Sequence, residues 1–161
     1  MGRTAYGVRG IRLGENDALI SMIVDRGADI LTVSAEGYGK RTPIDDYQVK
    51  GRGTQGVLSM KLSERTGQVV AAIPVKEGDQ IMLIASTGQL VRTNVGEIST
   101  LSRNTQGVRV IRLRGAELVG VDRIDAALVA EMEAAEAALA APEADPAQGD
   151  STEDPADAPD T

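Results

Sequence analysis

The first 125 residues contain a series of short apolar segments separated by turn residues. Within these segments the apolar residues recur at a period of about two, which is the spacing of a β-strand and not of a helix. In the first part of the chain these segments are residues 8–13, 18–24, 30–34 and 39–44, of which 18–24 has the pattern of a buried strand. A second set follows at residues 57–62, 69–75, 81–86 and 90–95. Four short antiparallel strands in about 50 residues are typical of a propeller-like blade, so the chain is predicted to be all-β.

The chain also repeats itself. One loop occurs three times, beginning at Arg3, Arg52 and Arg103, at spacings of 49 and 51 residues. The difference is a two-residue insertion between Leu62 and Val75, a change that a hairpin turn tolerates. A period of this length predicts stacked supersecondary units. Residues 1–125 hold little more than two such units, whereas a closed ring needs about four to eight. We therefore expect an incomplete ring: a piece of a longer protein, or blades with unpaired edges.

The pattern changes at Asp122 to an Ala- and Glu-rich stretch with a spacing of three or four residues. Its apolar positions are Ile124, Leu128, Met132, Ala135 and Leu139. Either Asp122 or Asp125 could cap the helix that this spacing predicts, and Pro142 would end it. Residues 143–161 are too polar and proline-rich to pack, so we expect disorder there. The predicted division is blades over 1–125 and an acidic tail over 126–161, helical to about 141.

Charge divides the chain at the same place. All 17 basic residues lie in 1–125 against 14 acidic ones, a net charge of +3, whereas 126–161 holds ten acids and no base. A basic body with an acidic tail indicates nucleic acid as a partner. The tail is either a solubilising appendage or a competitor of DNA for the basic surface. With no cysteine or histidine, the chain offers no disulfide, thiolate or histidine chemistry. No apolar run is long enough to span a bilayer, and the first residues lack a signal peptide, so we expect a cytoplasmic protein without a membrane partner.

Basic residues occupy equivalent positions in successive repeats. Three sets share a position: Arg3, Arg52 and Arg103; Arg12, Lys61 and Arg112; and Arg41 and Arg92. These cations either protect strand edges or form a stripe that contacts phosphates. Single-stranded nucleic acid is usually held by stacking on aromatic rings, and the chain has only three tyrosines and no Phe or Trp. The stripe therefore favours duplex DNA, bound through its phosphates with strong salt dependence and little sequence preference.

Two other patterns could indicate a nucleotide site and a metal site, but each match is incomplete. Residues 51–56 spell G-x-G-x-x-G, but a dinucleotide loop must open a helix and a strand pattern follows here. Asp45 and Asp46 could ligate a metal, yet the next repeat has no equivalent pair. We interpret both as turns.

Residues 2–13 and the Arg-x-Thr-Gln-Gly-Val loops at 52–57 and 103–108 are similar to the C-terminal domain of bacterial DNA gyrase A. The resemblance covers residues 1 to about 125, and an acidic tail is also usual in that family. It implies a β-pinwheel, a relative of the propeller, that wraps duplex DNA on a basic rim. The Gln-Arg-Arg-Gly-Gly-Lys-Gly box of the first blade is absent, so the resemblance is to the last blades and tail.

The resemblance also implies the partner chains and the absence of the family's catalytic tyrosine from these residues. Wrapping would support ATP-dependent negative supercoiling by a type IIA topoisomerase holoenzyme of two gyrase A and two gyrase B chains, with ATP and Mg²⁺ bound elsewhere and no cofactor in these residues. The DNA-cleaving tyrosine of the family follows an arginine, and none of Tyr6, Tyr38 and Tyr47 does. No catalytic or metal-binding residue is therefore predicted, and nucleoid association is expected. Two alternatives stay open: the C-terminal domain of the related decatenating topoisomerase, and a propeller-like protein-interaction module.

Overall fold

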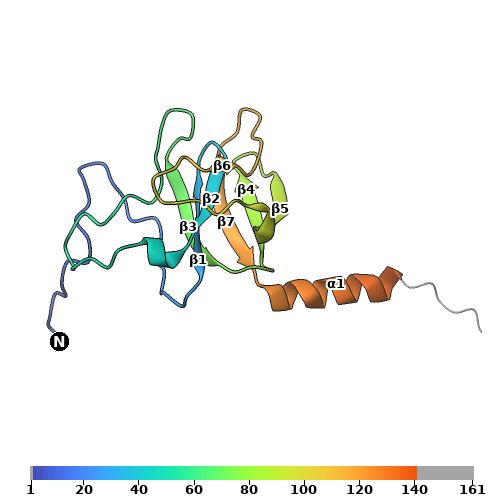
Figure 1. Ribbon diagram of the computed structural model, residues 1–161, viewed down its shortest axis with the longest axis horizontal. Coiled ribbons are helices and arrows are strands. Elements are labelled where there is room, and N and C mark those ends of the chain that lie inside the picture. Colours follow the sequence, from blue (N-terminus) through green and yellow to red (C-terminus); the bar gives the residue numbers. More distant parts are fainter. Residues whose placement is uncertain (1, 141–161) are drawn as a thin grey trace, which may run out of the picture.

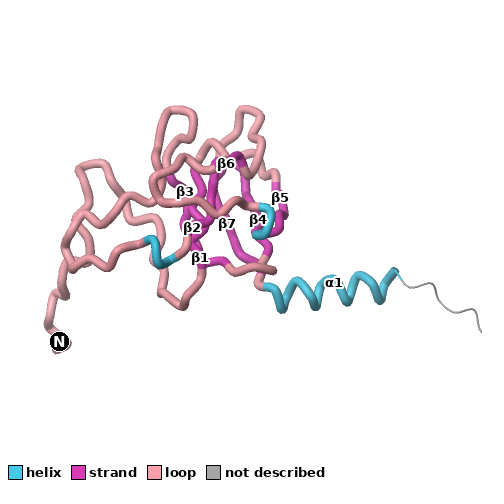
Figure 2. Tube along the Cα trace, viewed as in Figure 1, coloured by secondary structure: helices cyan, strands magenta, loops and turns pink. Residues whose placement is uncertain are grey.

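Two antiparallel sheets form the centre of the molecule in the computed structural model, which describes residues 2–140 (Figures 1 and 2). The four-stranded sheet has the order β3-β1-β2-β6, and the three-stranded sheet has the order β5-β4-β7. The strands of the first are β1 (Asp29–Ser34), β2 (Tyr38–Thr42), β3 (Val69–Val75) and β6 (Val108–Arg109). Those of the second are β4 (Gln80–Ala85), β5 (Leu90–Asn94) and β7 (Leu118–Ile124). These blades have the predicted propeller-like, unclosed arrangement, which confirms the all-β class.

Each sheet combines strands from neighbouring repeats. The hairpin β1–β2 pairs with β3 of the next repeat, and the hairpin β4–β5 pairs with β7 of the repeat after that. The register recurs as well, because Asp29 lies opposite Val75 while Gln80 lies opposite Ile124. Even the irregularity recurs, since both pairings shift register near the end of the first hairpin strand, at Val33/Ser34 and Ile84/Ala85. Each sequence repeat therefore contributes a hairpin to one sheet and a strand to the sheet of the preceding repeat.

Three of the predicted strands do not form. Residues 8–13, 18–24 and 57–62 contain no strand, apart from a single bridge between Ile11 and Thr54. The prediction that 18–24 is a buried strand is wrong, because Leu19 is 68% exposed and Met22 is 86% exposed. The reason lies in the strand exchange: 18–24 is equivalent to β3, and β3 needs the hairpin of the preceding repeat as its partner. No such hairpin exists within residues 2–140.

The outer edge of β5 is open in the same way. On the first sheet β6 covers β2, whose residues are almost all buried. In the part of the chain that the structure describes, no strand pairs with the equivalent edge of β5, and its residues alternate between exposed and half-buried. Leu90 at its start is 59% exposed.

The core lies between the two sheets. Its buried members come from both hairpins, from β3 and β7, and from the segments that follow the hairpins: Leu31, Val33, Val75, Ile81, Leu83, Val95, Ile98, Ile111 and Leu118. Two equivalent 3₁₀ turns, η1 (Ile44–Asp46) and η2 (Val95–Glu97), follow the two hairpins. In η1, Asp45 and Asp46 belong to a surface turn, as expected.

A glycine fixes the shape of the repeated loop. Gly7, Gly56 and Gly107 are equivalent, and all three have φ between 76° and 80°, a conformation that costs glycine little and other residues more. At Gly107 the packing requires glycine too, because an added Cβ would lie 2.6 Å from the carbonyl oxygen of Gly39. The glycines of residues 51–56 thus serve turning, and no helix follows them.

Helix α1 (Ala126–Ala140) projects away from the sheets (Figure 1). Asp125 caps it, because its carboxylate accepts a hydrogen bond of 3.1 Å from the backbone N–H of Leu128. Asp79 accepts a second, of 3.0 Å, from Ala126. The predicted apolar stripe does not pack: Met132 and Leu139 are exposed, and Val129 is the buried residue. No helix in residues 2–140 has the length and apolarity of a bilayer-spanning segment, and the expected disorder of 143–161 lies outside the described residues.

Candidate nucleic-acid interface

Most of the predicted phosphate contacts reach solvent. Five of the eight are exposed and make no side-chain hydrogen bond or ion pair within residues 2–140: Arg3, Arg12, Arg52, Lys61 and Arg112. The other three, Arg41, Arg92 and Arg103, have partners within the protein. Exposure leaves a cation free to meet a phosphate, so the first group meets a basic requirement of the predicted stripe.

Backbone hydrogen bonds interleave the first two sets of cations. The N–H of Arg12 donates to the carbonyl of Thr54, at 2.8 Å, and so lies beside the loop that carries Arg52. One repeat later, the N–H of Lys61 donates to the carbonyl of Thr105, at 2.9 Å, beside the loop that carries Arg103. The same contact made twice brings the backbone of the second cation of one repeat beside the loop that carries the first cation of the following repeat. Segments that carry cations far apart in the sequence are in this way brought side by side.

Arg41 is engaged within the protein. Its guanidinium Nη1 lies 2.7 Å from a carboxylate oxygen of Glu77, and its Nε donates to the carbonyl of Ile98 at 2.8 Å. Only 12% of its side chain is exposed. The hypothesis that Arg41 contacts phosphate therefore loses the free guanidinium on which it depends.

Arg41→Gln and the equivalent Arg92→Gln should consequently behave differently. We expect Arg41→Gln to cost about 1 kcal/mol of unfolding free energy, because Ile98 loses a hydrogen-bond donor, while the salt dependence of duplex binding stays unchanged. Arg92→Gln should leave stability unchanged and reduce the salt slope by about 0.9. Equal slopes for the two variants in fluorescence-anisotropy titrations would contradict this assignment.

Arg103 also folds against the protein surface. Its Nε donates to the carbonyl of Asp46 at 2.7 Å and its Nη1 to that of Leu58 at 2.9 Å, with the ring of Tyr47 6.0 Å away. These bonds fix the guanidinium, and its second terminal nitrogen makes no hydrogen bond within residues 2–140. Arg103 can therefore offer a directed donor, unlike a freely rotating surface cation.

A buried lysine donates hydrogen bonds to the loop that carries Arg103. Lys40 is completely buried, and its ammonium donates to the carbonyls of Ser102 and Arg103, at 2.6 and 2.5 Å, and to the hydroxyl of Thr105, at 3.1 Å. Burial, and then the neighbouring charge of Arg103, lower the pKa of Lys40 to about 8, while Asp46 opposes the shift. Lys40 lies outside the repeated sets, since Val91 is its equivalent in the next repeat, and the repeat pattern gave no reason to select it.

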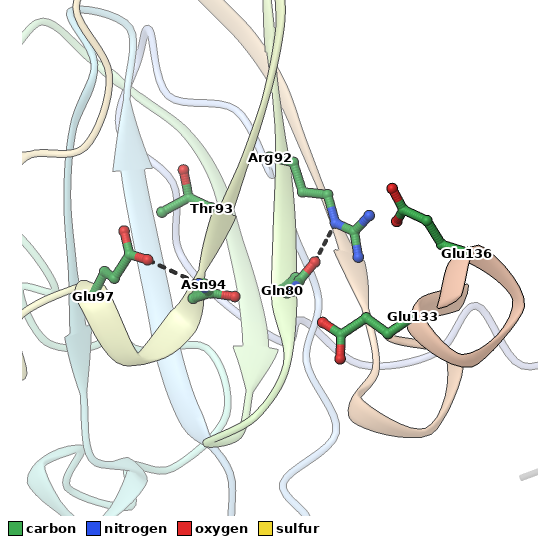
Figure 3. Close-up of a pocket in the computed structure, with 7 residues that line it drawn as sticks. All are labelled: Gln80, Arg92, Thr93, Asn94, Glu97, Glu133 and Glu136. Carbon is green, nitrogen blue, oxygen red and sulfur yellow. Dashed lines mark hydrogen bonds between the residues drawn. The ribbon is translucent and has the colours of Figure 1, made fainter. Parts of the chain in front are cut away.

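Arg92 faces acidic side chains of helix α1. A hollow between the β4–β5 hairpin and the helix is lined by Arg92 and Gln80 on one side and by Glu133 and Glu136 on the other (Figure 3). The Nε of Arg92 donates to the side-chain oxygen of Gln80. No carboxylate within residues 2–140 lies close enough to Arg92 to form an ion pair. The helix acids therefore bias the field around Arg92 without neutralising it by direct contact.

Comparisons with known proteins agree with this architecture. The model of the DNA gyrase C-terminal domain, a beta-propeller, matches residues 1–24, 28–76 and 79–125. Over 126 residues the chain is 53% identical to the DNA gyrase A protein of Pseudomonas aeruginosa and 55% identical to that of Salmonella typhimurium. Each alignment covers 77% of this chain and 14% of the relative, so the chain spans a small part of those proteins.

Solved structures give the same result. A DNA gyrase A C-terminal domain superposes with a TM-score of 0.69 at 33% identity, covering 74% of this chain and 41% of that one. A DNA topoisomerase IV C-terminal domain shares the fold, with a TM-score of 0.68 at 20% identity over 84% of this chain and 43% of the other. Taken with the repeat and the exchanged strands, these likenesses show that the chain belongs to the DNA gyrase C-terminal domain family.

Proposed function

We propose that this chain binds duplex DNA through the phosphates, as part of a DNA gyrase A protein. The observation that carries the proposal is the interleaving of cations, in which Arg12 lies beside the loop of Arg52 and Lys61 beside the loop of Arg103. Neighbouring cations along a surface suit a polyanion with regularly spaced charges. They explain why positive charge recurs at these positions better than protection of strand edges does, because residues 8–13 and 57–62 form no strand.

The aromatic residues favour a duplex over a single strand. Base stacking needs exposed rings, and each stacked base contributes about 1–3 kcal/mol. Tyr38 is only 3% exposed and Tyr47 is half-buried, which leaves Tyr6 as the one fully exposed ring in residues 2–140. A surface of exposed cations with one free ring suits the outside of a double helix.

Wrapping and supercoiling extend the proposal. A bent duplex could follow a curved row of cations if the bending cost were repaid by further phosphate contacts. In a holoenzyme with gyrase B, such wrapping would assist the ATP- and Mg²⁺-dependent strand passage carried out elsewhere. These partners and cofactors, and a cytoplasmic, nucleoid-associated location, belong to the proposal.

A comparison of two polymers tests the proposal. We expect the full chain to bind a duplex of about 40 base pairs at low salt more tightly than a single strand of equal length, with no preference for sequence. A propeller-like module for protein interaction, which the open edge of β5 favours, would bind neither polymer. Preference for the single strand would overturn the duplex proposal.

Removal of the acidic residues that face Arg92 should strengthen DNA binding. We expect Glu133→Gln/Glu136→Gln to tighten duplex binding about threefold at low salt, since surface charges of this kind contribute below about 1 kcal/mol. Deletion of residues 126–161 should have a larger effect, because it removes all ten acids of the tail. In an Arg92→Gln background the double substitution should have no effect. Unchanged affinity after the deletion would contradict competition by the tail.

A further inference from the structure

Two arginines outside the repeated sets converge on one buried tyrosine. The hydroxyl oxygen of Tyr38 accepts a hydrogen bond of 2.8 Å from Nε of Arg65 and another of 2.8 Å from Nη2 of Arg109. Both guanidinium carbons also lie over the ring, 4.9 and 5.1 Å from its centroid. Tyr38 is 3% exposed, whereas both arginines are exposed. The tyrosine is thus a buried support that fixes two surface cations next to each other.

Arg65 reaches this place because of the two-residue insertion. The insertion lengthens the turn at 63–68 relative to the equivalent turns at 14–17 and 114–117. Thr66 anchors it: this side chain is fully buried, its hydroxyl accepts from the N–H of Ser63 at 2.9 Å, and its carbonyl accepts from the N–H of Glu36 at 3.2 Å. The extra length is therefore an ordered turn docked on the end of β1, and it presents Arg65 over Tyr38.

The backbone fixes Arg109 as firmly. It lies directly opposite Tyr38 in the pairing of β6 with β2. Two residues further along, Ile111 passes so close to Gly37 that an added Cβ there would lie 2.6 Å from the Ile111 carbonyl oxygen. The backbone at Arg109 is therefore held beside the tyrosine, and the hydrogen bond to the Tyr38 hydroxyl orients the side chain. Both guanidinium groups are thus oriented by Tyr38 in the absence of a ligand.

The cluster has positive charge without a matching acid. Within residues 2–140 no carboxylate oxygen lies within 4.0 Å of either guanidinium. A guanidinium has about five N–H donors, and each of these two makes one side-chain hydrogen bond in the described chain, to the Tyr38 oxygen. The hydrogen bond from Arg109, followed by that from Arg65, lowers the pKa of Tyr38. An environment that favours a phenolate favours other oxyanions as well.

From this arrangement we infer that Arg65 and Arg109, fixed by Tyr38, form a clamp for a single phosphodiester of the bound duplex. The inference rests on the proposed function and adds a site that the repeated cations do not include. Paired guanidiniums suit phosphate oxygens because their planar forks donate several parallel hydrogen bonds. Since the insertion occurs in one repeat only, the clamp marks one position on the duplex path.

Neutralisation of the clamp tests the inference in the full chain. We expect Arg65→Gln and Arg109→Gln each to weaken duplex binding about three- to tenfold. The double variant should lower the salt slope by about 0.9, the value for one phosphate. Arg26→Gln is the matched control, since this exposed arginine precedes the opposite end of β1, and its effect should be smaller. Tyr38→Phe keeps all charges and should still weaken binding about twofold or more, with the melting temperature recorded for every variant.

Each contrary result has a distinct meaning. If the clamp variants equal Arg26→Gln in affinity and slope, or if Tyr38→Phe binds as the wild type does, the inference is wrong. A slope loss of about 1.8 for the double variant would mean separate phosphate contacts and would also overturn it. Inorganic phosphate, titrated at constant ionic strength, should not saturate the N–H signals of Arg65 and Arg109. If it does saturate them, and the double variant binds the duplex as the wild type does, the cluster is a site for free phosphate and the clamp is wrong. Absence of salt-dependent duplex binding in the wild type would instead reject the proposed function.

Discussion

Lys40→Met should destabilise the protein by about 3 kcal/mol, the largest effect on stability that we expect from one substitution. Methionine fills much of the same space but donates no hydrogen bond, so two backbone carbonyls and the hydroxyl of Thr105 lose their donor. Each buried acceptor left without a partner costs about 1–3 kcal/mol, and removal of a buried charge offsets part of that sum. In a domain of this size the melting temperature should fall by about 10 °C.

The same residue predicts a pH dependence of stability. The pKa of Lys40 is about 8 in the folded protein, against an ordinary value of 10.5. Between these values the unfolded chain binds more protons, so the free energy of unfolding rises with pH, by up to about 3 kcal/mol. Below the folded pKa the residue is charged in both states and its contribution is constant.

Chemical denaturation at a series of pH values measures both effects. The difference between wild type and Lys40→Met should widen as the pH rises from about 8 to 10.5, while Lys50→Met, at an exposed lysine, should follow the wild type throughout. Tyr38 is present in all three proteins, so its titration cancels in the difference. A Lys40→Met protein as stable as Lys50→Met would show that the ammonium does not hold the Arg103 loop.

Loss of five stripe cations should weaken duplex binding about 100-fold or more at about 100 mM salt. The five are the exposed residues without a side-chain partner in the described chain: Arg3, Arg12, Arg52, Lys61 and Arg112. Each phosphate contact contributes about 0.9 to the slope of log Kobs against log salt, so replacement of all five by glutamine should reduce the slope by about 4.5. Anisotropy titrations of one duplex at a series of salt concentrations measure the change.

A second set of five exposed cations provides the control. Arg9, Arg26, Lys50, Lys76 and Arg114 lie outside the repeated sets, and their replacement changes the net charge equally. We expect this variant to lose less than half as much slope. Equal losses would mean that the DNA responds to net charge rather than to a row of aligned cations.

The repeat predicted the hairpins well and their neighbours poorly. Predicted segments 30–34, 69–75, 81–86 and 90–95 agree with β1, β3, β4 and β5 to within one residue at each end. The pairing partners of these strands lie in the described chain. Segment 18–24 has the same local pattern as β3 and forms no strand, because strand formation depends on a hairpin in another repeat. A local pattern cannot reveal an exchanged partner.

The candidate site was predictable only where it follows the repeat. The exposed cations recur in register, so the sequence identified them. Arg41 shares that register, yet Glu77 from a distant turn engages its side chain. Arg65 lies in an insertion, and Lys40 has no basic counterpart, so register selected neither. The insertion itself was the available signal for Arg65, since an extra turn that carries an arginine is a reason to ask what it approaches.

The salt dependence of duplex affinity for the unmodified chain tests the central claim most directly. With about six exposed cations in contact with phosphates, the plot of log Kobs against log salt should have a slope of about −5. The affinity should then fall about a thousandfold between about 50 and 200 mM salt. A slope between zero and about −1, at any affinity, would contradict the proposal that these repeats hold DNA by its phosphates.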